Sequence, residues 1–189
     1  MLFSVLKRLG CGATMLGVIV AMYSITQNVL GTAIITTIIG VRQGSPTSCL
    51  LFILYVNDLI KLLKETCQPD GFLSWLHLLM LMDDTVLLAT DRENIVRKCN
   101  LLIQFCNKYG MIVNESKTKL MVINGNINDK QPIVVNNLSI THADSYIYLG
   151  SPFSSDGSLS TAIKLHVQAK MGHFHKFVAF LNKNSDINF

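Results

Sequence analysis

The sequence predicts an α+β fold, and three observations support this class. Stretches in which apolar residues recur every three or four positions alternate with short runs rich in β-branched residues. Asn, Asp, Gly and Pro separate these stretches, as is typical of tight turns. The 189 residues contain no internal repeat and no low-complexity tract. Helices mixed with a mainly antiparallel sheet are the pattern of the α+β class.

Ten elements are expected along the chain. In order they are 2–9 (helix), 15–23 (helix), 32–40 (strand), 45–65 (helix), 75–89 (hairpin), 90–110 (helix), 119–123 (strand), 133–140 (hairpin), 146–157 (hairpin) and 160–181 (helix). The isolated strands are expected because their residues are apolar and largely β-branched. The hairpins are expected where two such runs meet at turn residues, as at Asn136-Asn137.

Three of the helix ends carry specific signals. Ser45 before Pro46 predicts a helix start, because a serine side chain accepts a backbone N–H at the N-cap and proline loses nothing at the first helical position. Thr90 followed by Glu93 predicts a capping box at the start of the next long helix. Gly110 predicts the end of that helix, since glycine adopts the left-handed conformation of a C-cap.

The opening of the chain raises the question of a membrane segment, because no charge occurs in the 33 residues between Arg8 and Arg42. A spanning helix needs about 20 predominantly apolar residues. The uninterrupted apolar run Met15–Tyr23 is only nine residues long, and Thr26-Gln27-Asn28 is polar. We therefore expect a core helix followed by a core strand, and no membrane partner. A small membrane-anchored protein that uses residues 13–41 is the alternative.

Composition excludes other classes. Half of the residues are hydrophobic and 15% are charged, which is the opposite of a disordered chain. The five cysteines are widely spaced without a Cys-x-x-Cys pair, so neither a disulfide framework nor a zinc site is indicated. A formal net charge of +4 permits a nucleic-acid partner without requiring one.

The acidic pair Asp83-Asp84 is the clearest candidate for chemistry. Apolar runs flank it on both sides, and two carboxylates in such a place are costly unless they are exposed, paired or bound to a cation. Mg²⁺ prefers oxygen ligands and keeps open positions for phosphate oxygens. A simple turn without chemistry is the alternative interpretation of this pair.

A second candidate is the segment Arg42-Gln43-Gly44-Ser45. Arg42 can pair with phosphate, Gln43 can hydrogen-bond a base or sugar, and Gly44 lets a nucleotide approach the backbone. The helix start after Ser45 adds backbone N–H donors. A plain junction between a strand and a helix is the alternative interpretation.

Together these residues resemble the reverse transcriptases of non-LTR (LINE-type) retrotransposons. Four ordered motifs carry the resemblance. They are Gly40-Val41-Arg42-Gln43-Gly44-Ser45-Pro46-Thr47-Ser48 with Leu51-Phe52, Tyr55 and Asn57-Asp58-Leu59; Leu81-Met82-Asp83-Asp84-Thr85; Phe105, Tyr109-Gly110, Asn114 and Lys117-Thr118; and Tyr146 with Tyr148-Leu149-Gly150. The motifs lie within a span of roughly residues 2–183 that the resemblance covers.

The resemblance implies a right-hand polymerase architecture. Residues 1–130 would form the palm, 131–160 a pair of hairpins that includes one similar to the primer grip, and 161–189 the helical start of a thumb. It also implies Mg²⁺ as the cofactor, with Mn²⁺ as a substitute. The implied partners are an RNA template, a DNA primer and deoxynucleoside triphosphates. The oligomeric state stays open, and so does the location within the cell.

Individual roles follow from the resemblance alone. Asp83 would be a metal ligand with Asp84 as its supporting neighbour, and Lys117 would neutralise or protonate the pyrophosphate leaving group. The remaining implied site residues line the nucleotide and template site (Arg42, Gln43, Gly44, Ser45) or grip the primer end (Tyr148, Leu149, Gly150).

The sequence departs from the family pattern in two ways. Leu81 stands where the family usually has an aromatic residue. The family also places a further catalytic aspartate, preceded by the fingers, just upstream of the helix that here begins at Leu2. We expect this segment and the fingers to be missing, and the chain to be inactive as it stands. Other possibilities are a non-catalytic nucleic-acid-binding remnant and a gene fragment with no function of its own.

Overall fold

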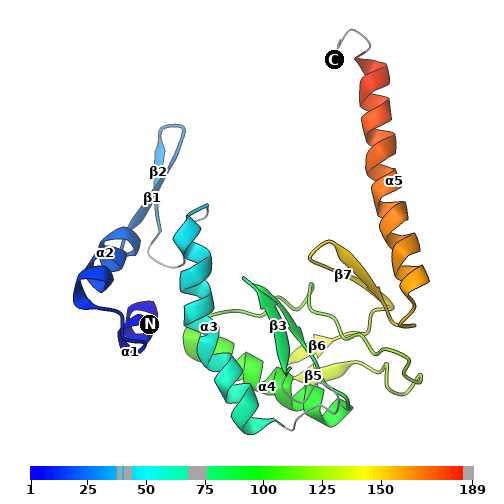
Figure 1. Cartoon of the computed structure of the whole chain (residues 1–189), viewed down its shortest axis with the longest axis horizontal. Coiled ribbons are helices and arrows are strands. Elements are labelled where there is room, and N and C mark those ends of the chain that lie inside the picture. Colours follow the sequence, from blue (N-terminus) through cyan, green and yellow to red (C-terminus); the bar gives the residue numbers. More distant parts are fainter. Residues whose placement is uncertain (38–39, 41–43, 68–75, 185–189) are drawn as a thin grey trace. The chain divides into compact units, whose positions relative to one another are not determined.

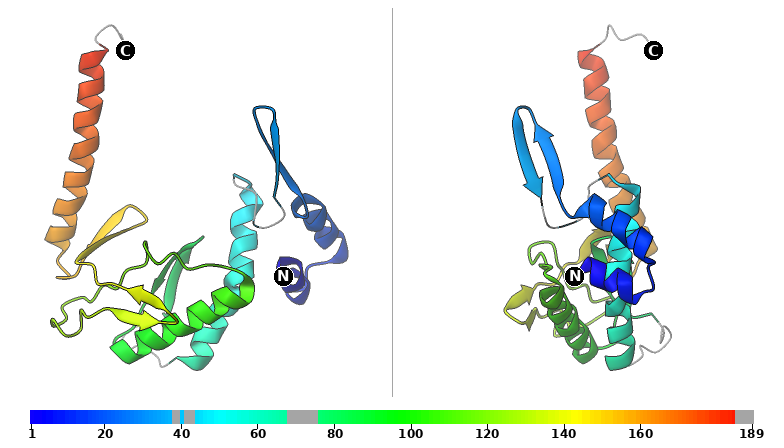
Figure 2. Two further views of the ribbon diagram at one scale, coloured as in Figure 1. Left: turned by 180° about the vertical axis from the view of Figure 1, so that it is seen from behind. Right: turned by 90° about the vertical axis from the view of Figure 1, so that its left-hand side faces the viewer.

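The computed structural model describes residues 1–37, 40, 44–67 and 76–184. The chain divides into two compact units, Met1–Ile112 and Val113–Phe189, and each is described by itself. Figure 1 shows the elements in chain order, and Figure 2 gives two further views. The described residues form five helices and four antiparallel strand pairs, which confirms a mixed helix and strand fold.

The first unit contains four helices and two hairpins. In chain order these are α1 (Leu2–Arg8), α2 (Ala13–Tyr23), β1 (Thr26–Leu30), β2 (Ala33–Thr37), α3 (Pro46–Thr66), β3 (Leu78–Leu81), β4 (Asp84–Leu87) and α4 (Arg92–Tyr109). The predicted helices over 2–9, 15–23 and 45–65 are confirmed. The predicted strand over 32–40 is observed as the shorter β2, paired with β1, which the sequence did not suggest.

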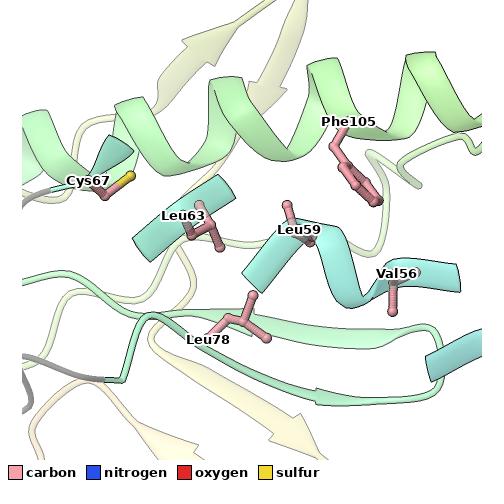
Figure 3. Packing of buried hydrophobic residues seen from close by; sticks show 6 residues of the cluster. All are labelled: Val56, Leu59, Leu63, Cys67, Leu78 and Phe105. Carbon is pink, nitrogen blue, oxygen red and sulfur yellow. The ribbon is translucent and has the colours of Figure 1, made fainter. Parts of the chain in front are cut away.

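The core of the first unit lies between α3, α4 and the β3–β4 hairpin. Figure 3 shows six of its residues, and they come from these elements and the residue after α3: Val56, Leu59, Leu63, Cys67, Leu78 and Phe105. Leu63 is fully buried and Leu59 is 1% exposed. A smaller cluster of Leu6, Tyr23 and Leu51 joins α1, α2 and α3.

By length and composition α3 is the one helix among the described residues that could cross a membrane. The core helix of a soluble protein passes the same test. Leu59 and Leu63 of α3 are buried against α4 and β3, whereas Leu50 and Ile53 near its N-terminal end are exposed. α2 is apolar but too short for this criterion.

The second unit contains two further hairpins and one long helix. They are β5 (Ile133–Val135) with β6 (Leu138–Ile140), β7 (Ser145–Tyr148) with β8 (Ser151–Ser154), and α5 (Leu159–Lys183). Both predicted hairpins and the predicted terminal helix are confirmed. The turn of β5–β6 is Asn136-Asn137, and both residues have positive φ, as a two-residue hairpin loop requires.

Four sequence predictions need correction. The strands do not form one mainly antiparallel sheet but four separate two-stranded hairpins in the described part of the chain. The predicted strand over 119–123 is absent, and only Leu120 makes a single bridge, to His142. This apolar run lacks an adjacent strand with which a ladder would form, and strand formation depends on such pairing.

The other two corrections concern helix starts. The N-cap of α4 is Asp91 and not Thr90, and the Asp91 carboxylate accepts a hydrogen bond from the Asn94 N–H at 2.7 Å. Ser45 does occupy the N-cap position of α3, but its side chain makes no capping hydrogen bond. Its hydroxyl instead lies 3.1 Å from the Tyr23 hydroxyl and 3.0 Å from the Thr47 hydroxyl.

Candidate active site

The Asp83-Asp84 pair lies at the end of the β3–β4 hairpin. Leu81 pairs with Asp84, so Met82 and Asp83 form a two-residue turn. Met82 has a φ of 56°, a conformation that costs a residue with a side chain on the order of 1–3 kcal/mol. Such values are required in tight hairpin loops and are concentrated at functional sites. The backbone is therefore strained at the residue just before the acidic pair.

The two faces of this hairpin differ. Successive residues of a strand point to opposite faces. Leu78 and Leu87 form one cross-strand pair on the face that packs in the core. On the other face Asp84 lies opposite Leu81, which is 52% exposed. Asp83 and Asp84 are both exposed. The core thus anchors the hairpin while both carboxylates remain accessible to solvent.

α4 supports the far end of the hairpin. The Leu88 N–H donates to the His77 carbonyl at 3.0 Å, which extends the strand pairing by one step. The carbonyl of Leu88 accepts a hydrogen bond from the ammonium group of Lys98. The Lys98 side chain is fully buried, and a buried polar group costs free energy unless it is hydrogen-bonded. This contact joins α4 to the strand that begins with Asp84.

The donor set fits a hard divalent cation. Carboxylate oxygens are the ligands that Mg²⁺ prefers, and it is commonly bound by one or two carboxylates together with waters and substrate phosphates. Asp83 and Asp84 could supply these oxygens. In the described part of the chain no group of three or more His, Cys, Asp or Glu residues gathers to form a closed metal site.

The predicted nucleotide segment is described only in part. Arg42 and Gln43 lie outside the described residues. Gly44 has a φ of 81°, which a glycine adopts without strain, and Ser45 follows in an extended conformation before Pro46 opens α3. The structure adds Tyr23, whose hydroxyl lies 3.1 Å from the Ser45 hydroxyl. No sequence pattern indicated Tyr23, since the contact joins residues 22 positions apart.

Lys117 belongs to the second unit, in a turn that Asn114 organises. The Asn114 side-chain oxygen accepts hydrogen bonds from the Ser116 hydroxyl at 2.8 Å and the Lys117 N–H at 3.2 Å. The Tyr146 hydroxyl of β7 donates to the Lys117 carbonyl at 3.2 Å. The turn that carries Lys117 is therefore attached to the β7–β8 hairpin, which contains the residues similar to a primer grip.

An open cleft lies where these two segments meet. Its volume is about 500 Å³, and it is lined by Ser116, Lys117, Lys119, Ala143, Ser145, Tyr146 and Ile147. The Lys119 ammonium donates to the Thr141 hydroxyl at 3.1 Å. Two lysines beside a tyrosine ring give this cleft a positive charge and an aromatic surface.

The predicted primer-grip residues lie at the turn of the β7–β8 hairpin. Tyr148 ends β7, and Leu149 and Gly150 have φ values of 51° and 79°. Two successive positive φ values are typical of the tightest hairpin loops, in which the strand twist matches that of the turn. Leu149 is 50% exposed at the end of this hairpin.

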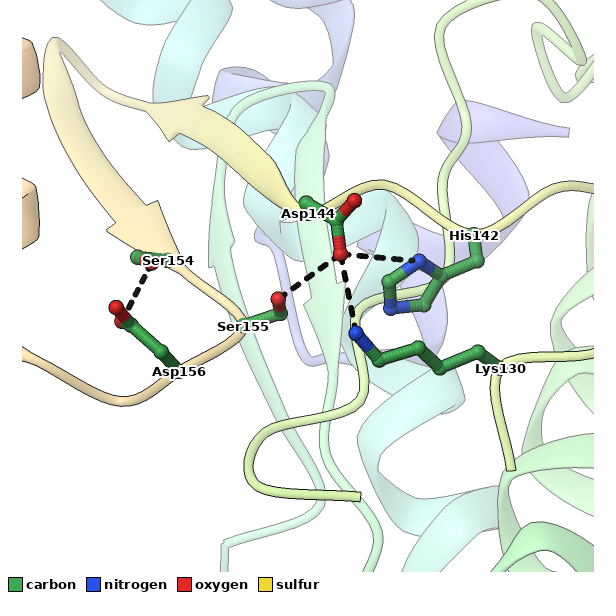
Figure 4. Close-up of polar contacts among 6 residues, drawn as sticks. All are labelled: Lys130, His142, Asp144, Ser154, Ser155 and Asp156. Carbon is green, nitrogen blue, oxygen red and sulfur yellow. Dashed lines mark hydrogen bonds and ion pairs between the residues drawn. The ribbon is translucent and has the colours of Figure 1, made fainter. Parts of the chain in front are cut away.

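A polar cluster closes the other end of this hairpin (Figure 4). The Asp144 carboxylate accepts hydrogen bonds from the Lys130 ammonium and the Ser155 hydroxyl, each at 3.1 Å. These two bonds, with the Lys130 charge, lower the pKa of Asp144. His142 adds a weaker contact, with Nδ1 at 3.7 Å from the same carboxylate. This cluster could not be predicted from the sequence, because its members come from three separate loops.

Asp156 lies between the end of β8 and the start of α5. It accepts hydrogen bonds from the Ser154 hydroxyl at 2.6 Å, the Ser158 N–H at 2.8 Å and the Thr161 hydroxyl at 2.8 Å. These bonds lower the pKa of Asp156. The contacts join the end of β8 to the first turn of α5, so they fix how the helix leaves the hairpin.

Similarity to known proteins extends over most of the chain. The family model described as "Reverse transcriptase (RNA-dependent DNA polymerase)" matches residues 1–153. The chain is also similar to the retrovirus-related Pol polyprotein from the type-1 retrotransposable element R2 of Nasonia vitripennis. The two are 31% identical over 139 residues, which cover 67% of this chain and 13% of that polyprotein. The chain therefore belongs to the reverse transcriptase family and carries part of a reverse transcriptase domain of the non-LTR type.

Proposed function

We propose that this chain carries the Asp-Asp part of the catalytic centre of an RNA-directed DNA polymerase. In this reaction the 3′-oxygen of a DNA primer forms a bond to the α-phosphorus of a deoxynucleoside triphosphate. The bond from that phosphorus to the β-phosphate oxygen breaks, the hydroxyl proton is released, and pyrophosphate departs. Bound Mg²⁺ or Mn²⁺ would supply charge neutralisation of the phosphate oxygens.

The observation that carries this proposal is the exposed pair Asp83 and Asp84 on a hairpin whose other face is buried in the core. The core holds the hairpin in place, and both carboxylates are exposed to solvent. Asp83 would be the principal metal ligand. Asp84 would support it from the first position of β4.

The remaining site residues have roles in the same proposal. Gly44 and Ser45, with Arg42 and Gln43, would face the incoming nucleotide and the template base. Lys117 would neutralise or protonate the pyrophosphate that leaves. The turn Tyr148-Leu149-Gly150 would hold the end of the primer.

We further propose that the 189-residue polypeptide does not polymerise by itself. No acidic residue precedes Asp58 in the sequence, and the Asp58 carboxylate is occupied by Arg8 and Tyr109. Two carboxylates from one hairpin leave the opposite side of a two-metal site without protein ligands. Each 1.36 kcal/mol of lost transition-state stabilisation lowers the rate about tenfold.

A primer-extension assay tests both parts of the proposal. The purified chain would be given a primed RNA template, deoxynucleotides and Mg²⁺ or Mn²⁺. We expect no extension, together with measurable binding of the primed template. Extension that disappears in Asp83→Ala would contradict the inactivity and support the assignment of the site. Extension that persists in Asp83→Ala would contradict the assignment of the site.

The lysine-lined cleft favours a second candidate function, that of a non-catalytic nucleic-acid-binding module. Lys117 and Lys119 line this cleft with Tyr146, and lysines neutralise phosphates while aromatic rings stack on bases. Binding of RNA–DNA duplex should weaken steeply with salt, and less steeply in Lys117→Gln/Lys119→Gln. A salt-independent affinity would exclude this candidate.

A further inference from the structure

Tyr23 contacts three hydroxyl groups at the start of α3. Its phenolic oxygen lies 2.7 Å from the Thr47 hydroxyl, 3.1 Å from the Ser45 hydroxyl and 3.3 Å from the Ser48 hydroxyl. The Ser45 and Thr47 hydroxyls are also 3.0 Å apart. One side chain at the end of α2 thus gathers every hydroxyl of the segment that opens α3.

The Tyr23 hydroxyl can bond these groups in either direction, because a phenolic hydroxyl both donates and accepts hydrogen bonds. Tyr23 is 7% exposed and Ser48 is 4% exposed, and the Tyr23 ring packs with Leu6 and Leu51. A buried polar group left without a partner costs about 1–3 kcal/mol. Packing therefore holds the Tyr23 ring in place, and hydrogen bonds to its hydroxyl orient the hydroxyls of Ser45, Thr47 and Ser48.

The contact changes what Ser45 does. A serine at an N-cap ordinarily turns its hydroxyl to the backbone N–H groups of the first helical turn. In α3 the Ser45 side chain makes no such bond, and its hydroxyl is directed to Tyr23 and Thr47 instead. Pro46 confines the Ser45 backbone to its extended conformation (φ −78°, ψ 129°), so only the side-chain rotamer of Ser45 stays open. The orientation of this residue then depends on Tyr23.

We propose that Tyr23 is a positioning residue for the segment Gly44–Ser48, acting through the Ser45 and Thr47 hydroxyls. The inference rests on the proposed function, which assigns this segment to the nucleotide and the template. Tyr23 itself does not touch the nucleotide. It holds the segment in one orientation before the nucleotide binds, so that less ordering is needed on binding.

The test is a double-mutant cycle on the full chain, with Tyr23→Phe and Thr47→Val as the two changes. The measured quantity is the affinity for deoxyadenosine triphosphate with Mg²⁺, by isothermal titration calorimetry. Tyr23→Phe should weaken binding about 3- to 10-fold, the size of one lost hydrogen bond. Tyr55→Phe is the matched control, since it removes another hydroxyl that α3 carries, one bonded to the Tyr109 carbonyl at 2.7 Å. The control should bind as the wild type does.

The coupling free energy between Tyr23→Phe and Thr47→Val distinguishes a positioning role from a merely structural one. If Tyr23 acts through these hydroxyls, the double variant binds no more weakly than the weaker single variant. Effects that multiply in the double variant would overturn the inference, and so would an unchanged affinity in Tyr23→Phe.

Amide hydrogen exchange at Ser48 tests the role of Tyr23 without requiring that the nucleotide binds. The Ser48 N–H is bonded to the Ser45 carbonyl at 3.1 Å, and it should exchange faster in Tyr23→Phe than in the wild type or in Tyr55→Phe. A wild type that does not bind the nucleotide would contradict the proposed function. An unchanged exchange rate at Ser48 would overturn the inference whether or not the nucleotide binds.

Discussion

Tyr109 and Asp58 are 51 positions apart in the sequence, and the Tyr109 hydroxyl donates to the Asp58 carboxylate at 3.0 Å. The same carboxylate oxygen forms an ion pair with Arg8. Tyr55 adds a further link, since its hydroxyl donates to the Tyr109 carbonyl at 2.7 Å. One carboxylate on α3 therefore connects α1 with the C-terminal end of α4.

This carboxylate predicts a pH dependence of stability. The hydrogen bond from Arg8, with the one from Tyr109, lowers the pKa of Asp58 below its ordinary value of 3.8. A lowered pKa in the folded state contributes stability that is present above the unfolded value and is lost as the pH falls through the folded value. Asp58→Asn should therefore lower stability near pH 7 and flatten its decline below about pH 4.

Urea unfolding at several pH values measures this effect. Glu65→Gln is the control, because Glu65 makes only an exposed contact of 3.8 Å with Lys61. It should leave the acid dependence as in the wild type. An Asp58→Asn variant with the wild-type slope between pH 5 and pH 3 would show that Asp58 contributes nothing to the acid dependence.

Two neighbouring residues of α3 test how this helix packs against the core. Leu59 is 1% exposed and Ile60 is 38% exposed. Leu59→Ala should lower the free energy of unfolding by about 2–5 kcal/mol, because it removes buried methyl groups and leaves a cavity. Ile60→Ala should cost about 1 kcal/mol or less. Equal losses, measured by urea unfolding, would contradict the packing of α3 against α4 and β3.

The buried cation of α4 gives a third prediction. Lys98→Met preserves most of the side-chain volume but leaves the Leu88 carbonyl without its ammonium donor. It should lower the free energy of unfolding by about 1–3 kcal/mol. Lys64→Met, at an exposed position of α3, should change it by no more than about 0.5 kcal/mol. A Lys98→Met variant as stable as the wild type would show that this hydrogen bond does not hold the hairpin to α4.

The cysteines should differ in reactivity. Burial raises the pKa of Cys99 to about 11 and also raises that of Cys106, so both stay protonated at pH 8. Cys49 is exposed. Iodoacetamide at pH 8 followed by mass spectrometry should label Cys49 first and leave Cys99 and Cys106 unlabelled until urea unfolds the chain. Early labelling of Cys99 would contradict its burial in α4.

Local sequence signals predicted much of the fold. Gly110 ends α4 with a φ of 70°, and Asn136-Asn137 closes a hairpin, because each position needs a backbone conformation that few residues adopt. The helix start at Ser45-Pro46 was predicted from its N-cap serine and first-turn proline, and its position is confirmed although the serine side chain does not cap the helix. The run over 119–123 looked equally like a strand, yet a strand requires a partner that the local sequence does not reveal.

The features that could not be predicted from the sequence are contacts between residues far apart in the chain. The acidic pair could be recognised because both carboxylates are adjacent in the chain. Asp58 could not be connected with Arg8 across 50 positions, nor Tyr23 with Ser45 across 22. Such contacts depend on how helices pack, and the side chains that make them carry no distinctive local pattern.

Asp83 and Asp84 are the residues that we propose to bind a divalent cation. Electron paramagnetic resonance of Mn²⁺, titrated into the chain with deoxyadenosine triphosphate present, tests this claim most directly. Asp83→Asn and Asp84→Asn should each weaken Mn²⁺ binding at least about tenfold, while Glu65→Gln binds as the wild type does. Wild-type affinity in both aspartate variants, or an equal loss in Glu65→Gln, would contradict the assignment.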